Sequence, residues 1–101
     1  MRTIRVGPFD FTILSDPDTD RELLADGDAG SSDPLRLTIK VRSDLPAPVR
    51  HETLVHETLH CILSVTPYSA ELTDADEERL VRTLAPFLTE LGFLDHYRDD
   101  E

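Results

Sequence analysis

The chain opens with two short stretches in which apolar and polar side chains alternate. The apolar positions are Ile4 and Val6 in the first stretch and Phe9, Phe11 and Ile13 in the second. Period-two alternation is typical of a strand with one buried face, and the Gly7-Pro8 pair between the stretches favours a turn. Residues 1–14 are therefore predicted to form a strand hairpin or a bent strand.

This pattern is lost over residues 15–34, where Asp, Gly, Ser and Pro dominate. The one apolar pair, Leu23-Leu24, is compatible with a single helical turn. We therefore expect an acidic loop over 15–34, and loops of that length without structure of their own are usually functional or mobile.

Alternation returns over residues 35–42. Leu35, Leu37, Ile39 and Val41 alternate there with Arg36, Thr38, Lys40 and Arg42. This pattern predicts a half-buried strand with a basic outer face over 35–42, which would join the hairpin in a small, mainly antiparallel sheet.

A long helix is predicted over 48–65. Its apolar positions are Val49, Leu54, Val55, Leu59, Ile62, Leu63 and Val65. Pro48 suits the first turn, because the N–H that proline lacks would be unpaired there, and Thr66-Pro67 ends the helix.

A second helix is predicted over 74–91, with Thr73 as its N-cap and acidic residues in its first turn. Its apolar stripe comprises Leu80, Val81, Leu84, Phe87, Leu88 and Leu91. Pro86 removes one helical hydrogen bond, so a kink or a break is expected there. Residues 95–101 are expected to form a frayed tail.

Composition narrows the class of protein. The 101 residues are expected to form one domain, and 21 acidic against 10 basic side chains give a net charge of -11. Nucleic acid is not expected as a partner of so acidic a surface, since phosphate contacts need Lys and Arg. The single cysteine, Cys61, fits a reducing compartment, and no stretch is long and apolar enough for a membrane span. A cytoplasmic protein without membrane contact is expected.

The predicted first helix contains an HExxH motif, His56-Glu57-Thr58-Leu59-His60. Residues four apart lie on the same helix face, so His56 and His60 can bind a single metal ion. Glu57 lies about 100° around the helix, where its carboxylate can reach a water on the open side of the metal and take its proton. The motif predicts a metal site with Glu57 as general base.

A catalytic zinc site usually needs a third protein ligand. Glu52 lies one helical turn before His56. Its Cα is about 12 Å from that of His60, which is too far for the side chains of Glu52, His56 and His60 to bind one ion. Cys61 points away from His60 and is interpreted as a small buried apolar residue. On the second helix, Glu77 lies four residues before Val81 and seven before Leu84, so it shares their apolar stripe and is the preferred third ligand. Glu78 is the alternative.

At this point the chain resembles the gluzincin class of zincin metallopeptidases, and more closely the small zincin-like metallopeptidase proteins of bacteriophages, prophages and actinobacteria. The resemblance rests on residues 52–60 and 77–86. It implies zinc (Zn2+) bound by His56, His60 and Glu77, with Glu57 as the catalytic base.

The 101 residues depart from the pattern of that class in two ways: none of their segments matches its C-terminal subdomain, and no residue plainly matches the one that stabilises the oxyanion. Tyr68, His96 and Tyr97 are the candidates for that role.

The sequence thus predicts an α+β fold, in which the sheet packs on the HExxH helix and the second helix returns an acidic ligand to the metal. The predicted function is zinc-dependent hydrolysis of a peptide or protein substrate, which could pair with an exposed strand edge. A non-catalytic zinc-stabilised binding or regulatory module with an acidic surface is the alternative. An acidic mimic of nucleic acid without metal is the third hypothesis.

Overall fold

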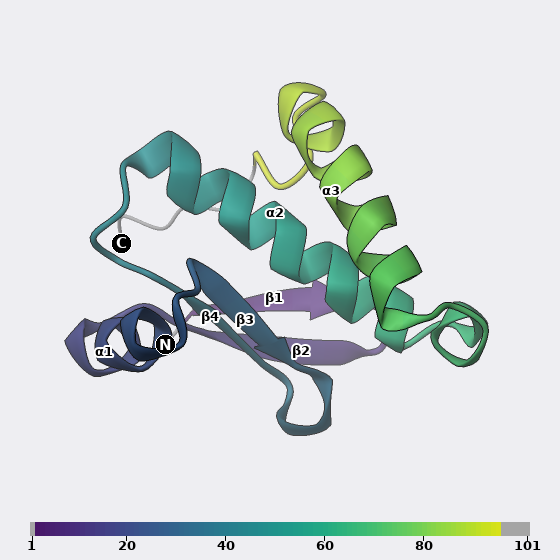
Figure 1. The fold of residues 1–101 in the computed structure, drawn as a ribbon, viewed down its shortest axis with the longest axis horizontal. Coiled ribbons are helices and arrows are strands. Elements are labelled where there is room, and N and C mark those ends of the chain that lie inside the picture. The colour runs from purple at the N-terminus through teal and green to yellow at the C-terminus, as the bar shows by residue number, and fades with distance from the viewer. Residues whose placement is uncertain (1, 96–101) are drawn as a thin grey trace.

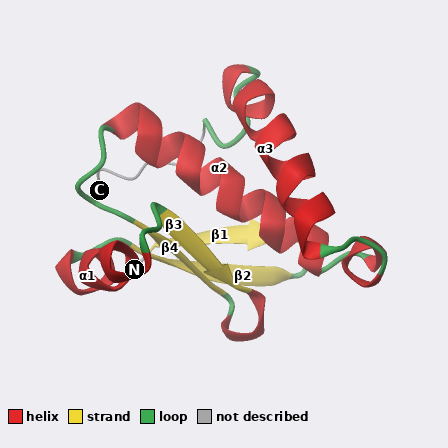
Figure 2. Ribbon diagram, viewed as in Figure 1, coloured by secondary structure: helices red, strands yellow, loops and turns green. Residues whose placement is uncertain are grey.

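The computed structural model describes residues 2–95, apart from the side chains of residues 68 and 69. It has an α+β fold in which a four-stranded sheet lies under α2, and α3 packs on α2 (Figures 1 and 2). The elements in chain order are β1 (Arg2–Val6), β2 (Phe9–Leu14), α1 (Pro17–Asp26), β3 (Gly30–Asp33), β4 (Thr38–Val41), α2 (Ala47–Ser64) and α3 (Asp74–Glu90).

The sheet is mixed, with strand order β1-β2-β4-β3. β1 and β2 form the predicted hairpin around Gly7, whose φ of 58° suits a tight turn. β2 runs parallel to β4, while β3 and β4 are antiparallel. The prediction of a mainly antiparallel sheet therefore misses one parallel pairing, and β3 is left as an edge strand beside α2.

The core lies between the sheet and α2. Its buried apolar residues are Ile4, Val6, Phe11, Ile13, Ile39 and Val41 from the sheet, Leu54, Val55, Leu59 and Cys61 from α2, Val81 and Ala85 from α3, and Leu94. Cys61 has no exposed surface, which confirms its interpretation as a small buried residue.

The expected acidic loop over 15–34 is wrong, because α1 and β3 lie within it. Asp16 caps α1 by accepting a hydrogen bond from the backbone N–H of Thr19, and Gly27 ends the helix with a φ of 74°. Leu23 is only 2% exposed, and α1 packs against β4. Caps and one buried leucine thus make a helix where hydrophobic periodicity is absent.

The predicted strand over 35–42 is too long. Residues Pro34–Arg36 form a 3-10 turn, and Leu37 has a φ of 52°, so the strand begins only at Thr38. Leu35 is consequently 97% exposed, whereas Ile39 is fully buried as predicted. The basic outer face is partly neutralised, because Nζ of Lys40 lies 2.8 Å from a carboxylate oxygen of Glu22.

The two long helices confirm the sequence prediction to within one residue at each end. Thr73 caps α3 by accepting a hydrogen bond from the N–H of Asp76, as predicted. Of the kink or break expected at Pro86, the break is not found, since α3 continues to Glu90 with Pro86 on its solvent-exposed side. Over residues 2–95, none of the helices combines the length and apolar character that crossing a membrane requires.

Candidate metal centre

Helix α2 presents the two histidines of the motif on one face. The rings of His56 and His60 have centroids 5.0 Å apart and are tilted by 59°. Both side chains are partly buried, with 24% and 16% of their surface exposed. Burial is the main cause that lowers the pKa of His56 below its usual value, which favours the neutral imidazole that a metal requires.

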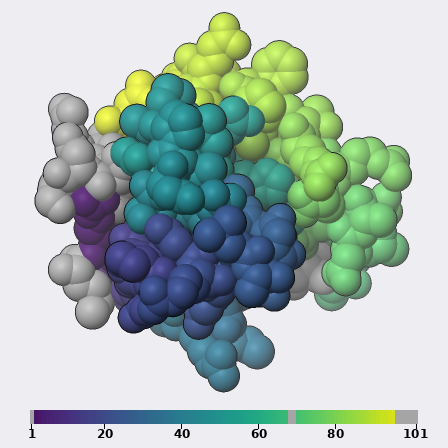
Figure 3. Space-filling model, turned by 60° about the vertical axis from the view of Figure 1, so that its left-hand side comes forward, coloured from purple at the N-terminus to yellow at the C-terminus, as the bar shows by residue number. Residues whose placement is uncertain are grey.

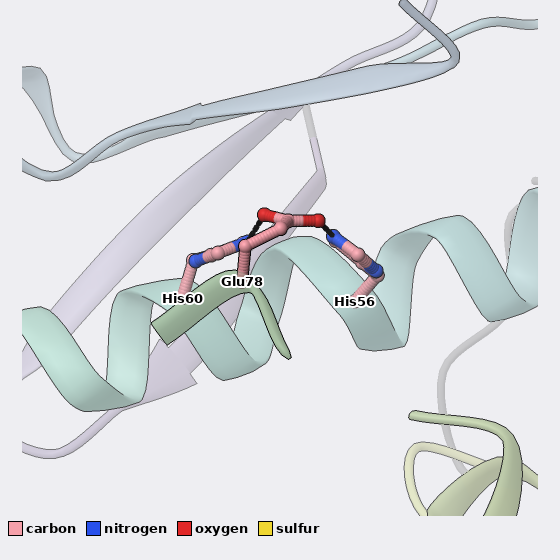
Figure 4. Close-up of side chains that lie close together, drawn as sticks. All are labelled: His56, His60 and Glu78. Carbon is pink, nitrogen blue, oxygen red and sulfur yellow. Dashed lines mark hydrogen bonds and ion pairs between the residues drawn. The ribbon is translucent and has the colours of Figure 1, made fainter. Parts of the chain in front are cut away.

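Glu78 of α3 lies between the two rings (Figure 4). Its Oε1 is 3.1 Å from Nε2 of His56, and its Oε2 is 2.9 Å from Nε2 of His60. One ligand atom from each of the three residues lies within 4.8 Å of the others. Ligands bound at 2.0–2.1 Å in a tetrahedral zinc site are about 3.4 Å apart, so this group could hold a metal ion.

Glu77, the third ligand preferred from the sequence, is not part of this group. Its Oε2 lies 2.6 Å from Nδ1 of His60, on the other side of the ring. The buried stripe of α3 explains the difference, because it consists of Val81 and Ala85 while Leu84 is 38% exposed. Stepping back three and seven residues from Val81 and Ala85 reaches Glu78, so the geometry favours the alternative ligand.

Glu57 faces the sheet side of α2 and is only 8% exposed. Burial raises the pKa of its carboxyl to about 7, although the nearby His60 and a hydrogen bond from the hydroxyl of Ser32 act in the opposite direction. β3 comes very close to α2 here. A Cβ at Gly30 would lie 2.7 Å from Cγ2 of Thr53 and 3.2 Å from Cγ of Glu57.

These side chains line a cleft of about 590 Å³. One wall is the segment from Gly27 through β3, and the other consists of α2 and the first turns of α3. Figure 3 shows the blue atoms of α1 and β3 below the teal atoms of α2, with the green atoms of α3 beside them. Glu52 also lines the cleft, exposed to solvent as expected, and it is not in the metal-binding group.

Arg82 is a cleft residue that the sequence analysis missed. Its Nε donates a hydrogen bond to Oε1 of Glu78, 3.0 Å away. Burial acts to raise the pKa of Glu78, but Arg82 and the two histidines lower it below its usual value. The four-residue spacing from Glu78 is the signal that could have identified this pair.

The three oxyanion candidates cannot be placed in the site. His96 and Tyr97 lie outside the described residues, and so does the side chain of Tyr68. Comparison with known protein families, curated proteins and solved structures gives no significant match for the chain. The case for function therefore rests on the motif and the geometry of the centre.

Proposed function

We propose that the protein is a zinc-dependent metallopeptidase with a minimal zincin-like arrangement of sheet and helices. One observation carries this proposal: ligand atoms of His56, His60 and Glu78 lie within 4.8 Å of one another, and the buried carboxyl of Glu57 borders the same cleft. Two histidines and one carboxylate are a common ligand set of catalytic zinc, and they leave a fourth position open.

The charges around the centre favour a divalent cation. Glu57, Glu77 and Glu78 surround two imidazoles in a partly buried space. Carboxylates crowded in this way repel one another and lose hydration, so a bound cation would offset both costs. Imidazole nitrogens make zinc a better match than calcium or magnesium, which prefer oxygen ligands.

Held by His56, His60 and Glu78, zinc would lower the pKa of a water molecule and polarise a carbonyl group. Glu57 accepts a proton from the attacking water as the water oxygen bonds to the carbonyl carbon. The same carboxyl delivers the proton to the leaving nitrogen when the C–N bond breaks. Glu77 orients the ring of His60 through Nδ1.

An extended peptide is the substrate that fits this cleft. β3 is an edge strand, and Gly30 and Ser32 line the cleft opposite His56. A peptide that pairs with the open edge of β3 would lie along α2 and pass the three ligands. The net charge of -11 would favour the approach of basic peptides.

Replacement of the base tests the proposal. Glu57→Gln should bind zinc as the parent does but cleave a pool of fluorescence-quenched peptides at least about 100-fold more slowly. His56→Ala is the matched control, which should lose zinc and activity together. Cleavage by Glu57→Gln at the parental rate would show that Glu57 is not the base.

A second candidate function is a zinc-stabilised binding or regulatory module. The observation that favours it is that the ligands come from both α2 and α3, so a bound ion would tie the two helices together. Metal affinity is then folding free energy. Unfolding on chelation, with no peptide cleavage by the zinc-loaded parent, would favour this function over the peptidase.

A further inference from the structure

Peptide hydrolysis places negative charge on the carbonyl oxygen, and a hydrogen-bond donor near the metal commonly stabilises that charge. The cleft offers few such donors. Among its described lining residues, Asp28, Glu52, Glu57 and Glu78 are acidic, and Arg82 is the one lysine or arginine. A donor with a permanent positive charge is therefore found at a single position.

The guanidinium of Arg82 is held through Nε, and within residues 2–95 its two terminal nitrogens make no hydrogen bond or ion pair. Nε donates to Glu78, the carboxylate that lies between the two histidines. This contact leaves the four N–H groups of the terminal nitrogens for other partners. The side chain is 75% exposed, so those groups are accessible to a substrate in the cleft.

Arg82 is also close to the metal-binding group. Its Nε lies 3.0 Å from Oε1 of Glu78, and the same oxygen lies 3.1 Å from Nε2 of His56. A guanidinium held beside the ligands stays charged at any accessible pH, so it can donate hydrogen bonds without giving up its proton.

We infer that Arg82 is a catalytic residue whose terminal nitrogens bind the carbonyl oxygen of the scissile peptide bond as negative charge develops on it. This inference rests on the proposed peptidase function. It gives the site the oxyanion-stabilising group that the sequence left open. The competing role, in which Arg82 only holds Glu78 in place for the metal, makes different predictions for zinc affinity.

The experiment compares Arg82→Ala and Arg82→Lys with the parent, and Arg79→Ala serves as the control. Arg79 lies on the same helix, is 79% exposed and is not part of the cleft lining. Zinc affinity, kcat, KM and the affinity for a phosphinic peptide are measured on each protein. A phosphinic peptide carries a tetrahedral phosphorus with a negatively charged oxygen, so it mimics the developing oxyanion.

Arg82→Ala should lower kcat by about 100- to 1000-fold and lower the affinity for the phosphinic peptide by a similar factor. KM and zinc affinity should stay within about threefold of the parent, because the lost interaction is made only in the transition state. Arg82→Lys should recover part of kcat, and Arg79→Ala should behave as the parent.

Two results would overturn the inference while leaving the peptidase in place. If Arg82→Ala kept the parental kcat at saturating zinc, Arg82 would make no catalytic contact. If the same variant also bound zinc more weakly, the role of Arg82 would be to hold Glu78 in place. If Arg79→Ala lowered kcat as much as Arg82→Ala does, the cause would be the overall positive charge of α3 and not a contact made by Arg82. A zinc-loaded parent that cleaves no peptide would instead overturn the proposed function, and this inference with it.

Discussion

Oε2 of Glu77 lies 2.6 Å from Nδ1 of His60, on the side of the imidazole away from the metal-binding group. A carboxylate at this distance accepts a hydrogen bond from Nδ1–H, which leaves Nε2 of the ring as the nitrogen that could bind a metal ion. Such a partner fixes the orientation and tautomer of a metal-binding histidine. In the proposed metal centre, the two neighbouring glutamates of α3 would therefore have different roles: Glu78 would bind the ion, and Glu77 would support a histidine that binds it.

Substitution of these two glutamates should separate the roles. Glu77→Gln should weaken zinc binding by about 10- to 100-fold, the usual effect of losing a group that supports a ligand. Glu78→Gln should weaken it much further, since a direct bond to the metal is lost. Competition with a zinc-binding dye measures both. If Glu77→Gln were the variant that loses zinc and Glu78→Gln kept it, Glu77 would be the third ligand.

The stability of the zinc-free protein should depend on Glu57 between about pH 5 and pH 8. Burial raises the pKa of this carboxyl from 4.5 to about 7 in the folded chain, so the folded state binds the proton more tightly than the unfolded state. The stability from this group is fully present below about pH 4.5 and is lost as the pH rises through about 7. The loss should reach roughly 3 kcal/mol at most.

Urea unfolding of the zinc-free parent and of Glu57→Gln at several pH values measures this loss. Three titratable residues face Glu57, namely His60, Glu78 and Asp28, and all three remain in the variant. The difference between the two curves of stability against pH therefore gives the contribution of Glu57 alone. Parallel curves for the two proteins would show that Glu57 is not a buried acid with a raised pKa.

Gly30→Ala should destabilise the fold and disturb the cleft. The added Cβ would lie 2.7 Å from Cγ2 of Thr53 and 2.9 Å from the backbone oxygen of Lys40, so β3 must move away from α2. We expect a cost of about 1–3 kcal/mol, measured by urea unfolding, together with reduced peptide cleavage. Ser31→Ala on the same strand is the control and should change stability by less than about 0.5 kcal/mol. Equal stability of both variants would contradict the close packing of β3.

The sequence was sufficient to predict α2 and α3 because each has apolar residues at helical spacing and clear ends, such as Thr73. It was insufficient for β3, whose residues Gly30–Asp33 include no apolar side chain. That strand exists because β4 offers an edge to pair with. α1 could have been recognised from its caps, Asp16 and Gly27, but not from hydrophobicity.

The arrangement of the candidate site was also only partly predictable from the sequence. His56, His60 and Glu57 followed from the motif, because spacing on one helix fixes which residues share a face. The choice between Glu77 and Glu78 depended on how α3 is rotated against α2. Ala85 sets that rotation by its burial, and an alanine contributes little to a hydrophobic stripe read from sequence. The rotation of one helix against another depends on contacts between the helices, and the local sequence pattern of either helix does not specify those contacts.

Zinc titration by calorimetry tests the central claim most directly, with the metal-free parent compared with His56→Ala and Glu78→Ala. Our account predicts one zinc ion per parent chain, bound at least about 100-fold more tightly than by either variant, since each variant loses one of three ligands. A parent that binds no zinc, or variants that bind it as tightly as the parent does, would contradict a metal centre at His56, His60 and Glu78.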